Sequence, residues 1–249
     1  MRTDVGGHFV EYETHGAGPD VVTLAHGLAS NRKTWGDQIP ALSRRYRVLT
    51  WDMRGHGASD TPPGPWTLAD LASDLRALLD ALGVARTHLV GHSGGGVAAL
   101  QFALTYPERL DHLVLASCAS QANARAAAWY ESLAERAERE GGAFTLSAFG
   151  VDEGDRAVAP DGVGFARASR CMATLHEAPL TPRLAEIRCP TSIIHGADDF
   201  IGPGGSVILH RGIPGSRLTI VEGRGHGLHL EDPAGFNRLV EDALGIPSA

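Results

Sequence analysis

Short apolar runs alternate with helical patterns along most of the 249-residue chain, and this alternation limits the possible folds more than any other sequence feature. Residues 21–25 form a continuous apolar run, bounded by Gly-Pro-Asp before it and His-Gly after it. Such a run is typical of a central parallel strand that is buried on both faces. Runs of the same kind occur at residues 47–51, 88–90, 112–116, 191–194 and 218–221. The alternation predicts right-handed βαβ crossovers and therefore an α/β fold, a mostly parallel central sheet with helices on both faces.

The clearest predicted helix extends from about Thr67 to Leu82. Thr67 can cap its first turn, Asp70 stands three residues later as in a capping box, and leucines recur at spacings of three and four residues. Gly83 is suited to end this helix, because glycine readily takes the left-handed conformation found at helix C-termini.

The alternation lapses between residues 120 and 188. Residues 122–140 have the pattern of a helix rich in alanine, glutamate and arginine, residues 150–164 are rich in glycine, aspartate and proline, and a short helix is expected near residues 165–176. Strand-like runs resume after this segment. We therefore expect a single domain over residues 1–249, with residues 120–188 inserted as a small helical cap, or lid, over the sheet.

Composition excludes several classes of protein. The 22 basic and 29 acidic side chains give a formal net charge of −7, which does not favour nucleic-acid binding. Hydrophobic residues make up 43% of the chain and charged residues 20%, which is close to the average composition of globular proteins. No apolar run approaches the roughly 18 residues of a membrane span, and the first residues lack the apolar core of a signal peptide. We expect a folded, cytoplasmic protein that has no membrane partner.

Cysteine and histidine usage indicates neither a metal nor a disulfide framework. Cys118, Cys171 and Cys189 are odd in number and widely spaced, which predicts buried thiols. No two of the 12 histidines stand at helical metal-ligand spacing in a convincing context. Lys33 is the only lysine, so a lysine-dependent mechanism has one candidate. We expect no metal and no cofactor.

Residues 89–98 combine a strand, a tight turn and a helix of small and apolar residues. The turn reads G-H-S-G-G over residues 91–95 and matches the G-x-S-x-G pattern of a nucleophile elbow. Such a turn strains the serine backbone so that its hydroxyl projects, and side chains two residues before and after it would collide, which requires glycine there. In this setting Ser93 is predicted to be a catalytic nucleophile; the alternative is a merely structural Gly-Ser turn.

A serine hydroxyl needs a base within hydrogen-bond reach and a third group that orients the base. Two aspartates, Asp198 and Asp199, follow one predicted strand, and two histidines, His226 and His229, follow the next. The C-terminal ends of parallel strands lie at one edge of the sheet, where ligands bind. Both loops are therefore expected to open at the edge where Ser93 lies.

With these residues, the chain resembles the α/β-hydrolase superfamily over nearly its whole length except the insertion. The order Ser93, Asp199, His226 is the family's order of nucleophile, acid and histidine. The resemblance implies an α/β-hydrolase fold with the cap inserted after the sixth strand. Catalytic roles for these three residues follow from it.

Two local patterns support the choice of acid and base. The family's Gly-x-x-Asp, with a proline four residues on, matches residues 196–203 and selects Asp199 over the preceding aspartate. Its Gly-x-Gly-His before Glu-x-Pro matches residues 223–233 and selects His226. His229 is the poorer candidate for the base, and its alternative role is in the pocket or in support of the catalytic groups.

Acyl transfer also needs donors aimed at the developing oxyanion. One is the backbone amide of Gly94, at the start of the helix after the nucleophile. The resemblance implies the amide of Leu28 as the second, because the family places it just after a His-Gly pair such as His26-Gly27, in which His26 braces the loop. Residues 52–60 resemble a further family signature, in which an arginine and glycines shape a turn beneath the site.

Serine at the elbow narrows the chemistry, because epoxide hydrolases and haloalkane dehalogenases of this fold need an aspartate there. Residues 35–42, 52–57 and 62–68 most resemble 3-oxoadipate enol-lactonases. The resemblance implies a serine hydrolase, of the carboxylesterase or lactonase type, that acts on a small-molecule ester or lactone. The alternatives are an acyl transferase or cyclase, a C–C bond hydrolase on the same triad, and a ligand receptor without turnover.

Aromatic and apolar residues in the loops and the insertion are candidates for the substrate pocket, with packing of the cap onto the body as the alternative for each. They are Trp35, Leu28, Trp129, Tyr130, Phe144, Phe149, Phe165, Met172 and Phe200. Arg125, Arg167 and Arg170 of the insertion are given no role, because arginines on such helices are usually solvated.

Overall fold

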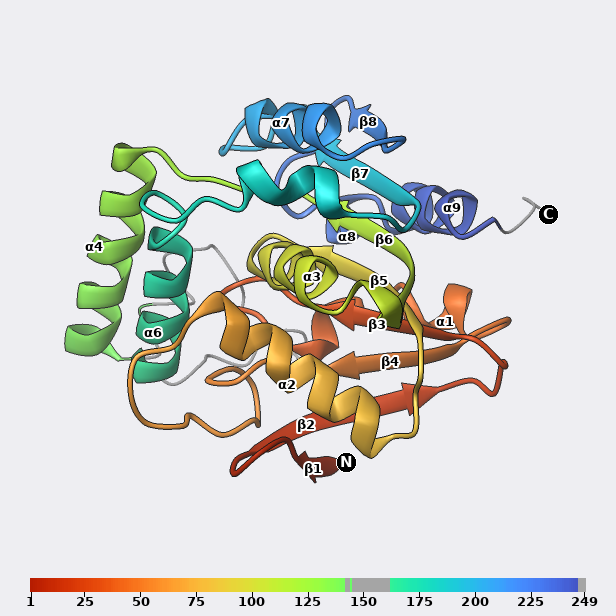
Figure 1. Cartoon of the computed structure of the whole chain (residues 1–249), viewed down its shortest axis with the longest axis horizontal. Coiled ribbons are helices and arrows are strands. Elements are labelled where there is room, and N and C mark those ends of the chain that lie inside the picture. The colour runs from red at the N-terminus through yellow and green to blue at the C-terminus, as the bar shows by residue number, and fades with distance from the viewer. Residues whose placement is uncertain (142–143, 145–161, 246–249) are drawn as a thin grey trace.

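The computed structural model describes residues 1–141, 144 and 162–245, and its centre is an eight-stranded sheet (Figure 1). The order is β1-β2-β4-β3-β5-β6-β7-β8, and every neighbouring pair from β4 to β8 is parallel. The strands are β1 (Arg2–Asp4), β2 (Phe9–His15), β3 (Val21–Ala25), β4 (Arg47–Trp51), β5 (Thr87–His92), β6 (Leu110–Ala116), β7 (Thr191–Gly196) and β8 (Arg217–Val221). The mostly parallel α/β sheet predicted from the apolar runs is confirmed.

Two strands were not expected from the sequence. β1 and β2 pair in antiparallel fashion with each other, and β2 pairs in the same way with β4. Both lie at one edge of the sheet and are only partly buried, so their residues do not form the continuous apolar run that marks a central strand.

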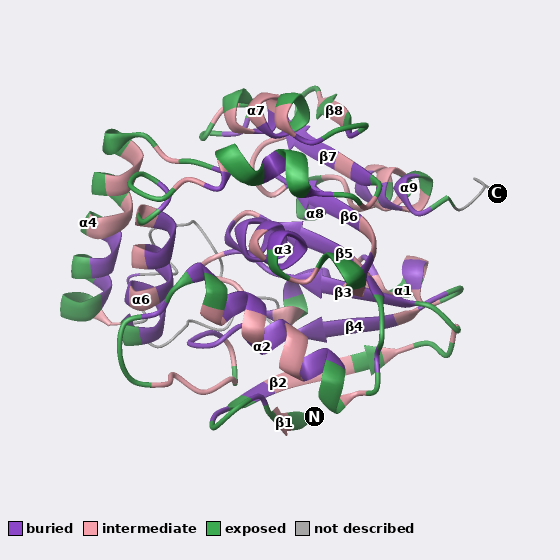
Figure 2. Cartoon of the chain, viewed as in Figure 1, coloured by how far each residue is buried: buried purple, intermediate pink, exposed green. Residues whose placement is uncertain are grey.

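Helices cover both faces of the sheet (Figures 1 and 2). The α-helices are α1 (Ile39–Leu42), α2 (Leu68–Ala81), α3 (Gly94–Thr105), α4 (Ala124–Glu140), α6 (Gly162–Ala173), α7 (Gly204–Gly212), α8 (Leu228–Glu231) and α9 (Pro233–Ala243). The 3-10 helices are η1 (Arg32–Trp35), η2 (Pro107–Arg109) and η3 (Thr181–Glu186). None of the described helices is long and apolar enough to cross a bilayer.

Alternate residues of a central strand pack into two separate hydrophobic cores, one on each face of the sheet. On β6, Leu113 and Leu115 join the cluster under α2, α3 and α7, whereas Val114 joins the cluster under α1 and α9. Successive side chains of a strand point to opposite faces, so a continuous apolar run fills two separate cores at once. The sheet is therefore held from both sides, and the C-terminal ends of its strands are fixed in position.

Helix α2 begins as its sequence predicts. The Thr67 side chain accepts a hydrogen bond from the Asp70 amide, and the Asp70 carboxylate accepts one from the Thr67 amide. This capping box satisfies two amides of the first turn, and the buried leucines of the helix face the sheet core. Gly83 follows with a φ of 63°, the conformation expected at the helix end.

The predicted insertion, residues 120–188, contains α4, α6 and η3, and most of its Gly/Asp/Pro-rich stretch lies outside the described residues. Helices α4 and α6 pack side by side at one end of the molecule (Figure 1). Their contact buries Leu133, Ala134, Ala137, Phe165 and Ala166. The pair thus has a small core of its own.

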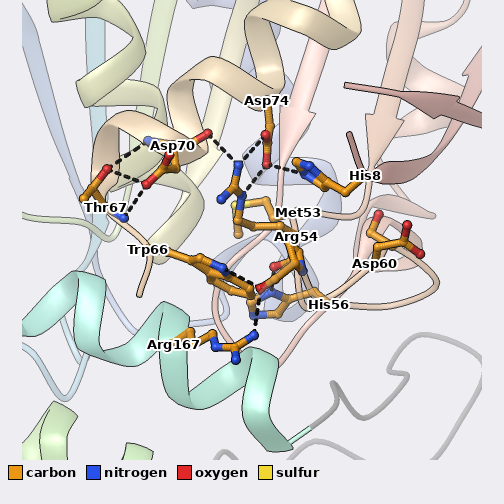
Figure 3. A network of polar contacts seen from close by, with 12 residues as sticks. His8, Met53, Arg54, His56, Asp60, Trp66, Thr67, Asp70, Asp74 and Arg167 are labelled. Carbon is orange, nitrogen blue, oxygen red and sulfur yellow. Dashed lines mark hydrogen bonds and ion pairs between the residues drawn. The ribbon is translucent and has the colours of Figure 1, made fainter. Parts of the chain in front are cut away.

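Trp66 joins α6 to the body of the protein (Figure 3). Its ring lies beneath two guanidinium groups, that of Arg54 and that of Arg167 on α6, each 5.6 Å from the ring centroid. Arg54 also donates two hydrogen bonds of 2.6 Å to the buried carboxylate of Asp74 on α2. Trp66 therefore lies between Arg167 of α6 and Arg54 of the body, and the buried ion pair with Asp74 holds Arg54 in place.

Candidate active site

Ser93 lies at a sharp turn between β5 and α3 with φ 53° and ψ −119°, a conformation that few residues other than glycine adopt. A Cβ at Gly91 would lie 2.5 Å from the Gly95 carbonyl oxygen, and one at Gly95 would lie 2.3 Å from the His26 carbonyl oxygen. The glycines two residues before and after Ser93 are thus sterically required. The turn has the geometry of a nucleophile elbow.

The loops after β7 and β8 bring Asp199 and His226 to this turn. His226 Nε2 is 2.9 Å from Ser93 Oγ, and His226 Nδ1 is 3.0 and 2.9 Å from the two carboxylate oxygens of Asp199. The neighbouring Asp198 is exposed. The structure therefore joins Ser93, His226 and Asp199 into one hydrogen-bonded chain, with the spacing that proton transfer from the serine hydroxyl requires.

The Asp199 carboxylate is buried, and burial by itself raises the pKa of a carboxyl group. The hydrogen bond and the charge of His226, the amide of Ile201 and, least, an electrostatic interaction with His195 act in the opposite direction and together outweigh burial. The pKa of Asp199 therefore lies below its ordinary value. Asp199 is ionised at neutral pH and can stabilise a positive imidazolium on His226.

The two residues whose amides are predicted to form the oxyanion hole, Gly94 and Leu28, lie next to each other in the structure. Gly94 is the first residue of α3, whose N-terminus carries a partial positive charge. The Leu28 amide nitrogen is 3.3 Å from the position that a Cβ on Gly94 would take, so the two residues adjoin beside Ser93. His26 supports this loop: its Nδ1–H donates to the Gly27 carbonyl at 2.8 Å, and its Nε2 accepts from the Met53 amide at 3.0 Å. The predicted bracing role of His26 is confirmed.

Two further histidines, His92 and His229, support the loop that carries His226. The sequence suggested such a role for His229 but not for His92. His92 Nε2–H donates to the His226 carbonyl at 2.7 Å, and burial, followed by the neighbouring histidines, lowers the pKa of His92 well below its ordinary value. His229 is buried, with Nε2 2.9 Å from Thr34 Oγ1, and its ring lies 4.5 Å from that of His92. The hydrogen bonds of both supporting rings go to other groups, and His226 is the histidine of the described residues whose ring nitrogen is hydrogen-bonded to Ser93 Oγ.

A cavity of about 340 Å³ opens beside Ser93 and His226 and extends between α4 and α7. Its wall is mostly apolar and includes, besides Ser93 and His226, Leu28, Val97, Cys118, Ala122, Trp129, Tyr130, Leu175, Phe200, Ile201 and Ile208. Within the described part of the chain, no arginine, lysine, aspartate or glutamate lines it. Burial raises the pKa of the Cys118 thiol to about 12, so Cys118 is a neutral part of the wall.

Seven of the candidate pocket residues are aromatic, and three of these, Trp129, Tyr130 and Phe200, line this cavity. Trp129 and Phe200 are partly exposed at its mouth, with ring centroids 6.2 Å apart, and the Phe200 ring is 4.8 Å from that of His226. The aromatic rim therefore combines a residue of α4 with one from the loop that carries Asp199.

The positions of Trp35, Phe144 and Phe165 correct the prediction, because these residues line no part of the cavity. Trp35 is fully buried on the opposite face of the sheet, with its ring 4.8 Å from that of His229 and 6.2 Å from that of Phe236. Phe144 and Phe165 are buried in the core between α4 and α6. An aromatic residue reduces exposed apolar area equally well in a core or in a pocket, so composition could not distinguish the two.

Other residues considered for the pocket divide in the same way. Leu28 and Tyr130 line the cavity, Met172 is buried in the main core, and Phe149 lies outside the described residues. Of the arginines, Arg167 donates to the Pro62 carbonyl and Arg170 to two glutamates of α4.

Comparison with known proteins agrees with this geometry. Residues 20–148 match the model of the alpha/beta hydrolase fold family. Over 94% of both chains, the sequence is 32% identical to a protein of Caulobacter sp. (strain K31) named "Putative carbamate hydrolase RutD". The protein of the same name from Caulobacter segnis is 45% identical over 109 residues, and in that match the chain spans only 41% of its relative's length. The chain belongs to the α/β-hydrolase family.

Solved structures show the same relationship. An enol-lactonase from Burkholderia xenovorans LB400 superposes with a TM-score of 0.82 at 26% identity, over 98% of this chain and 100% of that chain. A thermophilic esterase from Thermogutta terrifontis superposes with a TM-score of 0.87 at 29% identity, over 98% and 96%. The chain is similar to both over its whole fold.

Proposed function

We propose that this protein is a serine hydrolase that cleaves a carboxylic ester or lactone through an acyl-enzyme. The observation that carries the proposal is the continuous hydrogen-bonded chain from Ser93 Oγ through His226 to the buried Asp199. A hydroxyl becomes nucleophilic when a base takes its proton as it attacks, and here the base is within reach and oriented by a carboxylate.

In the first half-reaction, Ser93 Oγ attacks the substrate carbonyl carbon while His226 Nε2 takes the hydroxyl proton. The negative charge that develops on the carbonyl oxygen is stabilised by the amides of Leu28 and Gly94, aided by the N-terminus of α3. Asp199 stabilises the positive imidazolium through Nδ1–H. His226 then gives its proton to the leaving alkoxide oxygen, and the acyl-enzyme forms.

In the second half-reaction, His226 takes a proton from water as the water oxygen attacks the acyl carbon. The same amides stabilise the second tetrahedral intermediate, and its collapse returns the proton to Ser93 Oγ and releases the acid. An alcohol that reached the acyl-enzyme instead of water would give acyl transfer by the same steps. Water access under the α4/α6 pair, which we propose as the cap, thus decides between the two outcomes.

The cavity wall supports an uncharged acyl or alcohol group as the natural substrate. A buried carboxylate on the substrate would need a cation close by, and none lines the cavity among the described residues. We expect esters of short and medium uncharged acids to have a kcat/KM at least about tenfold higher than that of size-matched dicarboxylic half-esters. The measurement is steady-state hydrolysis of p-nitrophenyl butyrate, hexanoate and hemisuccinate, and equal values for all three would contradict this preference.

A carbamate is the second candidate substrate. The full-length relative from Caulobacter sp. carries a name that specifies carbamate hydrolysis, and a carbamate carbonyl presents the same atoms to the nucleophile and the oxyanion donors. Product analysis with matched p-nitrophenyl ester and carbamate substrates discriminates the two. A C–C bond hydrolase would instead release an acid from a diketone.

Covalent labelling tests the proposed nucleophile. A fluorophosphonate probe is expected to label the wild-type protein at Ser93 and to leave Ser93→Ala unlabelled, because phosphonylation needs the serine oxygen and the His226 base. Ser117, which also lines the cavity, provides the matched control: Ser117→Ala is expected to be labelled normally. A folded wild-type protein that is not labelled and does not turn over esters would contradict the hydrolase and favour a ligand receptor.

A further inference from the structure

A second histidine faces the acid of the proposed triad from within the sheet. His195 lies near the end of β7, four residues before Asp199, and both side chains are fully buried. His195 Nε2 is 3.5 Å from Asp199 Oδ2, the oxygen that is also 2.9 Å from His226 Nδ1. The carboxylate therefore lies between two imidazoles, that of His195 on β7 and that of His226 in the loop after β8.

The other ring nitrogen of His195 determines which tautomer faces Asp199. His195 Nδ1 is 3.0 Å from Ser206 Oγ, a fully buried hydroxyl on α7. When Ser206 donates its proton to Nδ1, His195 carries its own proton on Nε2 and directs it toward the carboxylate. The opposite tautomer would place an Nε2 lone pair against an ionised oxygen, which is repulsive.

Burial keeps His195 neutral. It lowers the pKa of His195, with a smaller contribution from the charge of His226, whereas the Asp199 charge and the Gly202 carbonyl raise it without reversing the shift. Tyr130 of α4, which is partly buried, also interacts electrostatically with Asp199, and its pKa is raised to about 12 by burial, then by Cys118 and Asp199. Among the described residues, the titratable groups that interact with Asp199 are thus His195, His226 and Tyr130, and both His195 and Tyr130 are uncharged at neutral pH.

We propose that His195 is a positioning residue, a neutral imidazole held by Ser206 that directs Nε2–H at Asp199 Oδ2 and so fixes the carboxylate against His226. This inference rests on the proposed serine-hydrolase function. Asp199 has two donors at hydrogen-bond distance, His226 Nδ1 at 2.9 Å and the Ile201 amide at 3.0 Å, and His195 Nε2 adds a longer third contact at 3.5 Å. Removing the third donor leaves the carboxylate freer to rotate and less well satisfied in its buried site.

Nitrogen NMR of the wild-type protein tests the tautomer without any substrate. With 15N-labelled histidine, the resonances of His195, assigned by their absence from His195→Gln, are expected to show a protonated Nε2 and an unprotonated Nδ1 near pH 7. A protonated Nδ1 in the folded wild type would overturn the inference. This result stands whether or not the protein hydrolyses esters, so failure of the proposed function and failure of this inference are separable.

Kinetics of three variants test the consequence for catalysis. His195→Phe keeps the ring volume but has no donor, and we expect kcat for p-nitrophenyl butyrate to fall on the order of tenfold with KM within about twofold, because His195 does not line the cavity. The acidic limb of the kcat/KM profile is expected to move to higher pH, because a less compensated carboxylate holds the His226 proton more tightly. His195→Gln, whose amide can donate in place of Nε2–H, is expected to keep most of the wild-type kcat and an acidic limb close to that of the wild type.

The chain contains a matched control. His210 on α7 makes the same kind of contact, with Nδ1 3.1 Å from Ser216 Oγ, but it is exposed. His210→Phe is expected to leave kcat and the pH profile unchanged. A His195→Phe variant with wild-type unfolding temperature, kcat and acidic limb would overturn the inference, as would a loss of activity that His195→Gln shares in full.

Discussion

At the scale of single residues, the site depends on side chains that are strained, buried or both. Ser93 keeps a positive φ that costs about 1–3 kcal/mol, and the strand and helix on either side of it compensate for that cost. Asp199 is an ionised group without solvent exposure, which is stable only because its hydrogen-bond partners satisfy it. The backbone conformation of Ser93 and the ionised state of Asp199 are thus both stabilised by the surrounding residues.

Substitution of the two adjacent aspartates should separate the acid of the triad from its neighbour. Asp199→Asn keeps the size of the side chain but can favour the wrong tautomer of His226, and we expect kcat to fall on the order of 10³-fold to 10⁴-fold. Asp198→Asn, at an exposed position, should remain within about twofold of wild type. Steady-state kinetics with p-nitrophenyl butyrate measure both, and the reverse order of effects would assign the acid to Asp198.

At the scale of elements, backbones that approach closely connect α6 to the body. A Cβ on Gly164 of α6 would lie 2.4 Å from the carbonyl oxygen of Gly55, which belongs to the turn at residues 52–60. The sequence signature in that turn therefore also bears on the contact with α6. Its glycine leaves room for α6, and Trp66 and Arg167 add a stacked contact beside it.

Gly164→Ala should weaken this contact. The added methyl group meets backbone atoms that cannot rotate away, so we expect the free energy of unfolding to fall by about 1–3 kcal/mol despite the better helix propensity of alanine. The matched control is Gly204→Ala at the start of α7, where a Cβ meets nothing within 4 Å. Urea denaturation of both variants measures the difference, and equal stability would show that α6 shifts without cost.

At the scale of the whole molecule, buried neutral histidines couple folding to pH. Burial lowers the pKa of His26 to about 4, and burial, then the nearby His26, lowers the pKa of His56 to about 3. In the unfolded chain both rings titrate near the ordinary value of 6.5. As the pH falls below 6.5, the unfolded chain therefore binds protons that the folded chain does not, and the folded state loses stability.

We expect the free energy of unfolding to decrease by about 2 kcal/mol for each of these two histidines between pH 7 and pH 5. Urea denaturation at pH 7, 6 and 5 measures this slope. His56→Gln should make it shallower, because one buried group no longer titrates, whereas His210→Gln at an exposed site should leave it unchanged. A stability that does not vary over this range would contradict the assignment of neutral buried rings.

The sequence by itself determined the parallel sheet, the elbow at Ser93, and the loops that carry Asp199 and His226. These features depend on contiguous residues: apolar runs form central strands, glycines permit one strained turn, and parallel strands end at one edge. The edge strands β1 and β2, which are only partly buried, lacked that local signal.

The tertiary structure alone decided which side chains face the cavity and which support the catalytic groups. Trp35 and Trp129 are alike in composition, yet one is fully buried beneath the sheet and the other lies at the cavity mouth. His92 is 134 positions from His226, the residue whose carbonyl it binds. Such roles arise from packing between distant segments, and no periodicity along the chain encodes them.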